Sequence, residues 1–155
     1  MKCSQQCIQA FNKASRVMGM IKRTIRFKEV RTMISLYKKI IRPHVEYCVS
    51  AWSPYYKNDK ELLEKVQRRF TKMIINMEGL SYEDRLQSLE LWSLEERRNR
   101  QDLIEAFKMA KGMTRIGLQE LFMLEENTKV TRGHSLKLAK MRCTLDCWRH
   151  FFLTE

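Results

Sequence analysis

Apolar residues recur at alternating steps of four and three near the start of the chain, which is the spacing of one face of an α-helix. The residues of this apolar stripe are Cys7, Phe11, Ala14, Met18, Ile21 and Ile25. The spacing predicts a helix from Ser4 to about Thr24, whose basic residues lie mostly on its other faces.

A second helix is predicted to begin near Lys28 and to be interrupted at Pro43. Because proline has no backbone N–H, the chain should kink or restart there. The inward positions before the proline are Val30, Met33 or Ile34, Tyr37, and Ile40 or Ile41. Those after it are Val45, Cys48 or Val49, and Trp52. The sequence therefore predicts a helical hairpin that is bent at Pro43.

The third long helix should follow a loop around Pro54. Asn58 and Glu61 have the spacing of a capping box, and Gly79 is the expected end of the helix. The residues of its core face are Leu62, Leu63, Val66, Phe70, Met73, Ile74 and Met77. This predicts an amphipathic helix with its charged residues on the opposite face.

Two serines mark further helix starts. Ser81 is the expected cap of a short helix over residues 82–90, and Ser93 with Glu96 forms another capping box. The helix that Ser93 begins should end at Gly112. Residues 118–124 could form one more short helix.

Composition supports helices throughout, since the 155 residues include only five Gly and two Pro. We predict an all-α fold, an irregular bundle of about five to seven helices with a loosely anchored C-terminal tail. The domain division that we expect is a helical region over residues 1–124, followed by a basic loop and tail over residues 125–155. No apolar run approaches the roughly 20 residues of a membrane span, so we expect an intracellular protein, nuclear or cytoplasmic.

The net charge of +12 is unevenly placed. Residues 1–30 carry seven bases and one acid, and residues 131–155 carry five bases and two acids. Residues 61–100 carry eight of each. A basic excess of this kind suits a nucleic-acid backbone, because each neutralised phosphate releases counterions. Charge that serves only solubility is the alternative.

Five cysteines allow a metal site to be considered. Two pairs are spaced four apart, and a histidine follows the second pair: Cys3 and Cys7, then Cys143 and Cys147 with His150. The spacing does not fit a zinc knuckle, which needs both a His and a further Cys downstream, because no Cys follows His150 before Glu155. We therefore expect free thiols, no metal and no cofactor.

Seven short motifs occur in one unbroken order between residues 36 and 69. They are Leu36-Tyr37, Arg42-Pro43, Glu46-Tyr47, Trp52-Ser53-Pro54, Leu63-Glu64, Val66-Gln67 and Arg68-Arg69. Further motifs follow at Tyr82-x-x-Arg85-Leu86-x-x-Leu89, Leu91 to Leu94, Glu96-Arg97-Arg98, Asp102-Leu103 and Thr131-Arg132-Gly133-His134. The ordered set resembles the region after the catalytic palm in reverse transcriptases of non-LTR (LINE-like, jockey-type) retrotransposons, and the resemblance covers nearly the whole chain. It implies a thumb and the helical region that follows it, with a truncated tail.

The chemistry of that family needs paired aspartates in the palm, which hold the catalytic metals. This sequence has no Asp-Asp pair. We therefore expect no polymerase activity from the isolated chain.

A basic stripe on the third long helix is the first candidate for binding nucleic acid. Its members are Lys65, Arg68, Arg69 and Lys72, and spacings of three and four place them on one side of the helix. The resemblance implies that a thumb holds a template duplex through such a helix. The alternative is a solvated face that pairs with Glu61 and Glu64.

Further candidates lie elsewhere in the chain. A second basic set lies near the end of the first helix: Lys22, Arg23, Arg26 and Lys28. Arg132 could contact a phosphate or simply form a turn with His134. Trp52 could stack on a base, although packing in the core is favoured. Arg97, Arg98 and Arg100 stand among acids, so we expect ion pairs within the chain.

The sequence leaves three functions to compare. The first is a fragment derived from a reverse transcriptase that binds RNA or DNA backbone without sequence preference. The second is a helical protein-interaction module or an inert relic without a nucleic-acid role. The third is a thumb subunit that completes a polymerase by joining a palm-containing chain. No membrane partner is expected.

Overall fold

The computed structural model describes residues 3–48 and 52–121. The described residues form helices and no strand, so the prediction of an all-α fold is confirmed. The chain divides into two compact units, residues 1–99 and residues 100–155. The predicted boundary after residue 124 and the predicted tail lie outside the described residues. None of the helices in the described part has the length and apolar character of a membrane span.

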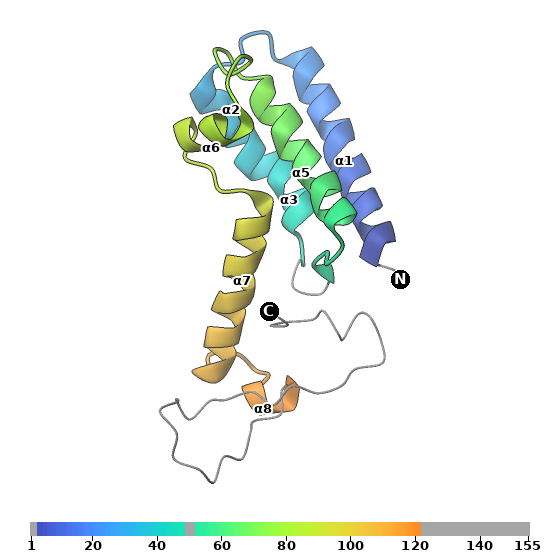
Figure 1. Ribbon diagram of the computed structural model, residues 1–155, viewed down its shortest axis with the longest axis vertical. Coiled ribbons are helices and arrows are strands. Elements are labelled where there is room, and N and C mark those ends of the chain that lie inside the picture. The colour runs from blue at the N-terminus through green and yellow to red at the C-terminus, as the bar shows by residue number, and fades with distance from the viewer. Residues whose placement is uncertain (1–2, 49–51, 122–155) are drawn as a thin grey trace. The chain divides into compact units, whose positions relative to one another are not determined.

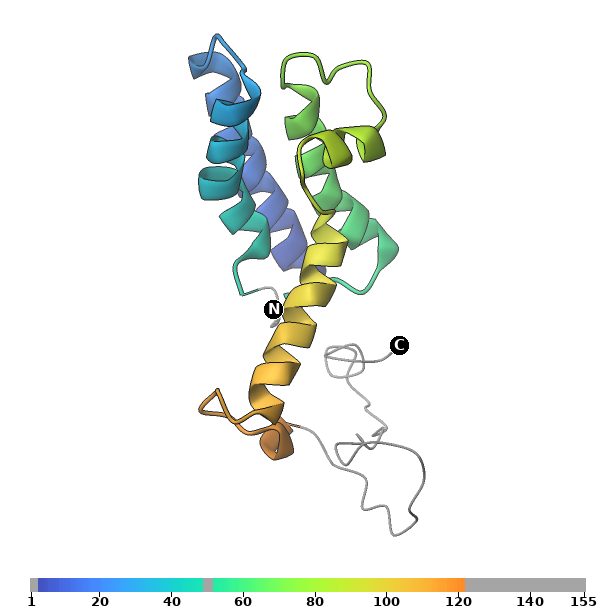
Figure 2. The same ribbon diagram turned by 90° about the vertical axis from the view of Figure 1, so that its left-hand side faces the viewer.

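The first unit is built on α1 (Cys3–Thr24) and α5 (Lys57–Lys72), which lie side by side and run in the same direction (Figures 1 and 2). Near the start of both helices, the Ser4 hydroxyl donates to Asp59 at 2.7 Å. Beyond their ends, the Ile75 N–H donates to the Lys28 carbonyl at 3.1 Å. The predicted apolar stripe of α1 is confirmed as the side that is turned to the core, with Cys7, Ala14 and Met18 buried.

In sequence, three segments connect α1 to α5 and run back in the opposite direction. They are α2 (Val30–Leu36), the π-helical turn η1 (Tyr37–Ile41) and α3 (Arg42–Glu46). Pro43 explains the π turn, because it has no N–H and its ring would clash with the carbonyl of a regular α-helix. The Arg42 N–H bonds the Tyr37 carbonyl, five residues back, and the helix restarts as α3. The predicted interruption at Pro43 is thus confirmed. Val30 is largely exposed, so its predicted inward position is wrong.

Two predicted ends of α5 are wrong. The helix begins at Lys57 after an extended Tyr56, and Asn58 lies inside it, so Asn58 cannot cap it. The helix ends at Lys72 and not at Gly79. The Thr71 hydroxyl binds the Gln67 carbonyl at 2.9 Å, and Asn76 takes a left-handed conformation (φ 64°) in the turns that follow.

The core of the first unit contains one internal polar pair. The Tyr37 hydroxyl donates to Gln67 Oε1 at 2.6 Å, and the Gln67 amide donates to the Trp92 carbonyl at 2.9 Å. Both Tyr37 and Gln67 are almost fully buried. The apolar residues of the core include Met33, Ile41, Leu63, Val66, Phe70 and Leu94. Burial and the carboxylates of Glu46 and Glu64 raise the pKa of Tyr37, so its hydroxyl remains a donor.

The two serine caps are confirmed. Ser81 Oγ accepts the Asp84 N–H at the start of α6 (Tyr82–Ser88). Ser93 and Glu96 exchange both bonds of a capping box at the start of α7 (Leu94–Ala110). The Ser93 hydroxyl and the Ser93 N–H both donate to the Glu96 carboxylate, and they lower its pKa.

The second unit holds the rest of α7 and the short α8 (Leu118–Leu121). Gly112 has φ 66°, and the Met113 N–H reaches back to the Lys108 carbonyl at 2.9 Å. This is the Schellman ending of α7, for which glycine is the favoured residue. The predicted end at Gly112 is confirmed.

The end of α6 uses the same motif without a glycine. The Leu91 N–H bonds the Leu86 carbonyl at 2.9 Å, and Glu90 holds the left-handed position at φ 50°. A side chain in that conformation costs about 1–2 kcal/mol. We expect Glu90→Gly to raise the free energy of unfolding by roughly 0.5–1 kcal/mol, after the extra entropy that glycine has in the unfolded chain is deducted.

Urea denaturation measures this change. The matched control is Glu83→Gly, which places glycine inside α6 and should lower the free energy of unfolding by roughly 0.5–1 kcal/mol. Equal losses from both variants would show that Glu90 is not strained.

Candidate nucleic-acid interface

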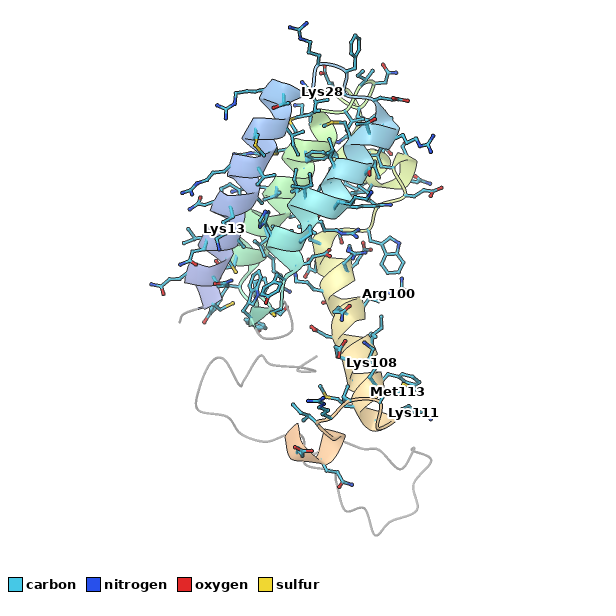
Figure 3. All side chains as sticks on the ribbon, turned by 180° about the vertical axis from the view of Figure 1, so that it is seen from behind. Lys13, Lys28, Arg100, Lys108, Lys111 and Met113 are labelled. Atoms are coloured by element: carbon cyan, nitrogen blue, oxygen red, sulfur yellow. The ribbon has the colours of Figure 1, made fainter. Side chains whose placement is uncertain are left out.

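The exposed side of α1 is basic and carries no acid. Over its 22 residues α1 contains no Asp or Glu. Its bases, all exposed, are Lys13, Arg16, Lys22 and Arg23. Figure 3 shows Lys13 along this helix and Lys28 beyond its C-terminal end. A polyanion beside α1 would therefore meet positive charge without an opposing carboxylate from this helix.

The predicted basic stripe of Lys65, Arg68, Arg69 and Lys72 is exposed on α5. Its two arginines lean to opposite sides. The guanidinium carbon of Arg68 lies 4.8 Å from the ring centre of Tyr82 on α6, and that of Arg69 lies 5.7 Å from the ring centre of Phe11 on α1. Each guanidinium thus lies against an aromatic ring, while both arginines remain exposed. The stripe thus extends sideways over its two neighbours.

The acids of α5 are used away from the stripe. Asp59 accepts from Ser4, and Glu61 pairs with Lys57 at 3.9 Å. The carboxylate of Glu64 accepts from the Tyr82 hydroxyl and from the Leu94 N–H at 3.1 Å. Within the described residues, no ion pair involves Lys65, Arg68, Arg69 or Lys72. The alternative in which Glu61 and Glu64 neutralise the stripe is therefore not what the structure shows.

Tyr82 has a role that its place in the sequence does not reveal. Its ring lies between Arg68 and Arg85, whose guanidinium carbon is 5.7 Å from the ring centre. Burial and the bond to Glu64 raise the pKa of Tyr82, which keeps the hydroxyl protonated as a donor. In the sequence, Tyr82 follows the capping serine of α6 and opens the Tyr82-x-x-Arg85 motif, and neither signal identifies its partners.

The second predicted basic set lies where α1 ends. Lys22, Arg23 and Arg26 are exposed, and Lys28 is half-buried. The hydrogen bond between Ile75 and Lys28 places this set beside the turns that follow α5. The two predicted sets therefore belong to neighbouring segments of one unit.

The arginines that were expected to form internal ion pairs differ from one another. Arg97 binds both carboxylate oxygens of Glu46, with its Nη2 at 3.1 Å, and Arg42 reaches the same carboxylate at 3.5 Å. This confirms the prediction for Arg97. Arg98 is buried, and burial lowers the pKa of its guanidinium although the carboxylates of Glu64 and Glu95 oppose that shift. Arg98 is therefore not available to a partner, and Arg97 is engaged by Glu46.

Trp52 behaves as the core interpretation predicts. It is half-buried against the apolar core, and its indole N–H donates to the Tyr47 carbonyl at 2.7 Å. Arg132 and His134 lie outside the described residues.

The cysteines of the first unit form no metal cluster. The described residues contain no group of three potential metal ligands. The Cys3 thiol donates to the Trp52 carbonyl at 3.0 Å. Cys7 is buried, and burial raises the pKa of its thiol to about 12. Cys143, Cys147 and His150 lie outside the described residues.

A comparison of the chain with protein-family models, with curated protein sequences and with solved structures finds no match. The candidate interface therefore rests on the residues of this chain alone.

If the stripe serves a partner, its lysines should contribute little to folding. We expect Lys65→Ala and Lys72→Ala each to change the free energy of unfolding by no more than about 0.5 kcal/mol. Phe70→Ala, on the buried face of the same helix, should cost about 3–5 kcal/mol. Chemical denaturation with circular dichroism compares the three. A decrease above roughly 1 kcal/mol for either lysine would assign the stripe a structural role.

Proposed function

We propose that this chain binds the sugar–phosphate backbone of RNA or DNA without sequence preference. The observation that carries the proposal is the unpaired state, among the described residues, of the four bases on α5 beside the acid-free α1. Exposed bases that their own acids do not neutralise can replace the counterions of a polyanion. The proposal agrees with the thumb-like hold on a template duplex that the sequence resemblance implies.

The donors on this surface suit phosphate contact. The guanidinium groups of Arg68 and Arg69 can each offer two parallel N–H donors to phosphate oxygens. Lys65 and Lys72 add compact charges on flexible stems. Contacts of this kind fix position on a backbone but do not read bases. Binding should therefore be weak and indifferent to sequence.

Charge reversal tests the stripe. We expect the variant with Arg68, Arg69 and Lys72 changed to Glu to bind an RNA–DNA hybrid duplex with much lower affinity. The logarithmic salt slope should fall by about 0.7–0.9 for each phosphate that the variant no longer neutralises. Titration at several salt concentrations measures both quantities, and circular dichroism verifies that α5 persists.

The matched control changes Lys38, Lys39 and Lys57 to Glu. It alters the net charge equally at other exposed positions of the same unit. An equal decrease in the control would mean that net charge alone drives binding, and unchanged affinity and slope in the folded stripe variant would refute the proposed surface.

A second test concerns catalysis. Because the sequence has no paired aspartates, we expect no primer extension when the purified chain is given primer, template, nucleotides and magnesium. Extension is followed on a denaturing gel beside an active polymerase. Extension that tracks the purified chain would contradict this assignment.

A further inference from the structure

Phe27 is the most exposed large apolar side chain of the described residues, at 84%. It lies in the connection between α1 and α2, next in sequence to Arg26 and Lys28. Helical periodicity does not single it out, because Phe27 is outside the apolar stripe of α1. An aromatic residue among bases is the combination that proteins use to hold single-stranded nucleic acid.

The connection that carries Phe27 is fixed on both sides. Ile25 packs against the core, and its N–H bonds the Ile21 carbonyl at 2.9 Å. On the other side the Lys28 carbonyl accepts from Ile75, and the Glu29 carbonyl accepts from the Met33 N–H at 2.9 Å. The ring is therefore displayed on an ordered turn, and binding a partner costs little backbone freedom.

Charge around the ring favours an anionic partner. Lys22, Arg23 and Arg26 are exposed on the same connection and the last turn of α1, and the one acid of these segments is the exposed Glu29. Exposed Ile75 (47%) and Val30 (39%) extend the apolar surface near the Lys28–Ile75 hydrogen bond. A nucleotide presents both features at once, a flat apolar base and a phosphate.

We propose that Phe27 stacks on an unpaired base of a single strand, or on the open end of a duplex, while Lys22, Arg23 and Arg26 hold the adjacent phosphates. This inference rests on the proposed function and adds a base contact to a backbone contact. Every base has a flat face, so the contact requires a base but not a particular one. The basic stripe on α5 would then hold the backbone, and Phe27 would engage the unpaired nucleotide.

The test compares two single strands of about ten nucleotides, one normal and one with abasic sites along its length. Both carry the same phosphates. We expect the chain to bind the normal strand more tightly and Phe27→Ala to weaken that binding about 5- to 150-fold. Binding of the abasic strand should be unchanged by Phe27→Ala.

Three further variants separate the causes. Phe27→Trp should keep the tight binding of the natural chain, whereas Phe27→Leu should not, since leucine is apolar but offers no flat face. Tyr56→Ala is the matched control: it removes a 55%-exposed ring immediately before α5, away from the Lys28–Ile75 end, and should leave binding unchanged. A fluorescent base, 2-aminopurine, placed in the normal strand reports stacking directly. The natural chain and Phe27→Trp should quench its fluorescence, whereas Phe27→Ala and Phe27→Leu should not.

The outcomes are distinct. Absence of binding to either strand and to the hybrid duplex would refute the proposed function itself. Salt-dependent binding that is equal for both strands and unaffected by Phe27→Ala would refute only the stacking inference. A third outcome is that the natural chain and Phe27→Leu bind vesicles of anionic phospholipid, that Phe27→Ala does not, and that Phe27→Ala leaves oligonucleotide binding unchanged. This result would refute base stacking and would show that Phe27 contacts a lipid surface.

Discussion

Much of the first unit depends on how the carboxylate of Glu64 is bonded. This one side chain of α5 accepts from the hydroxyl of Tyr82 and from the N–H of Leu94 in the first turn of α7. It thereby ties three helices together, and it places negative charge where the dipole of α7 favours it. Within the described residues Glu64 forms no ion pair with Arg68, four residues further along, although that spacing would allow one.

A comparable use of acids recurs through the unit. Glu46 is shared by Arg42 and Arg97, and Asp59 accepts from Ser4. Among the described residues, these carboxylates form no direct ion pair with the exposed bases of α1 and of the second half of α5. The positive charge of α1 and of the second half of α5 is thus left for solvent or for a partner. The repulsion among these bases is small at exposed positions and is partly offset by the rings of Phe11 and Tyr82.

Local sequence signals predicted well the features that local chemistry determines. The apolar stripe of α1, the serine caps of α6 and α7, and the glycine after α7 depend on residues within one or two turns. The capping box at Asn58 failed because the helix already begins at Lys57 and Glu61 pairs with Lys57, while the neighbouring Asp59 bonds Ser4 of α1. A contact with α1 cannot be read from the sequence around Asn58.

In the candidate site, too, the sequence predicted what neighbouring residues determine and missed what distant contacts determine. Spacing alone placed Lys65, Arg68, Arg69 and Lys72 on one exposed side of α5. Whether Glu61 and Glu64 would neutralise them depended on partners 18 and 30 residues from Glu64, at Tyr82 and Leu94. Phe27 was invisible to periodicity because its exposure follows from the way Ile25 and Lys28 anchor the connection.

In the proposed complex, nucleic acid contacts the exposed bases of the α1–α5 pair. Backbone amide NMR of the chain, titrated with a short RNA–DNA hybrid at low salt, tests it most directly. We expect the largest shifts to fall in residues 22–28 and 65–72 and to disappear as salt is raised. Shifts that are confined to η1 and α7, or none at concentrations where the hybrid is in excess, would contradict it.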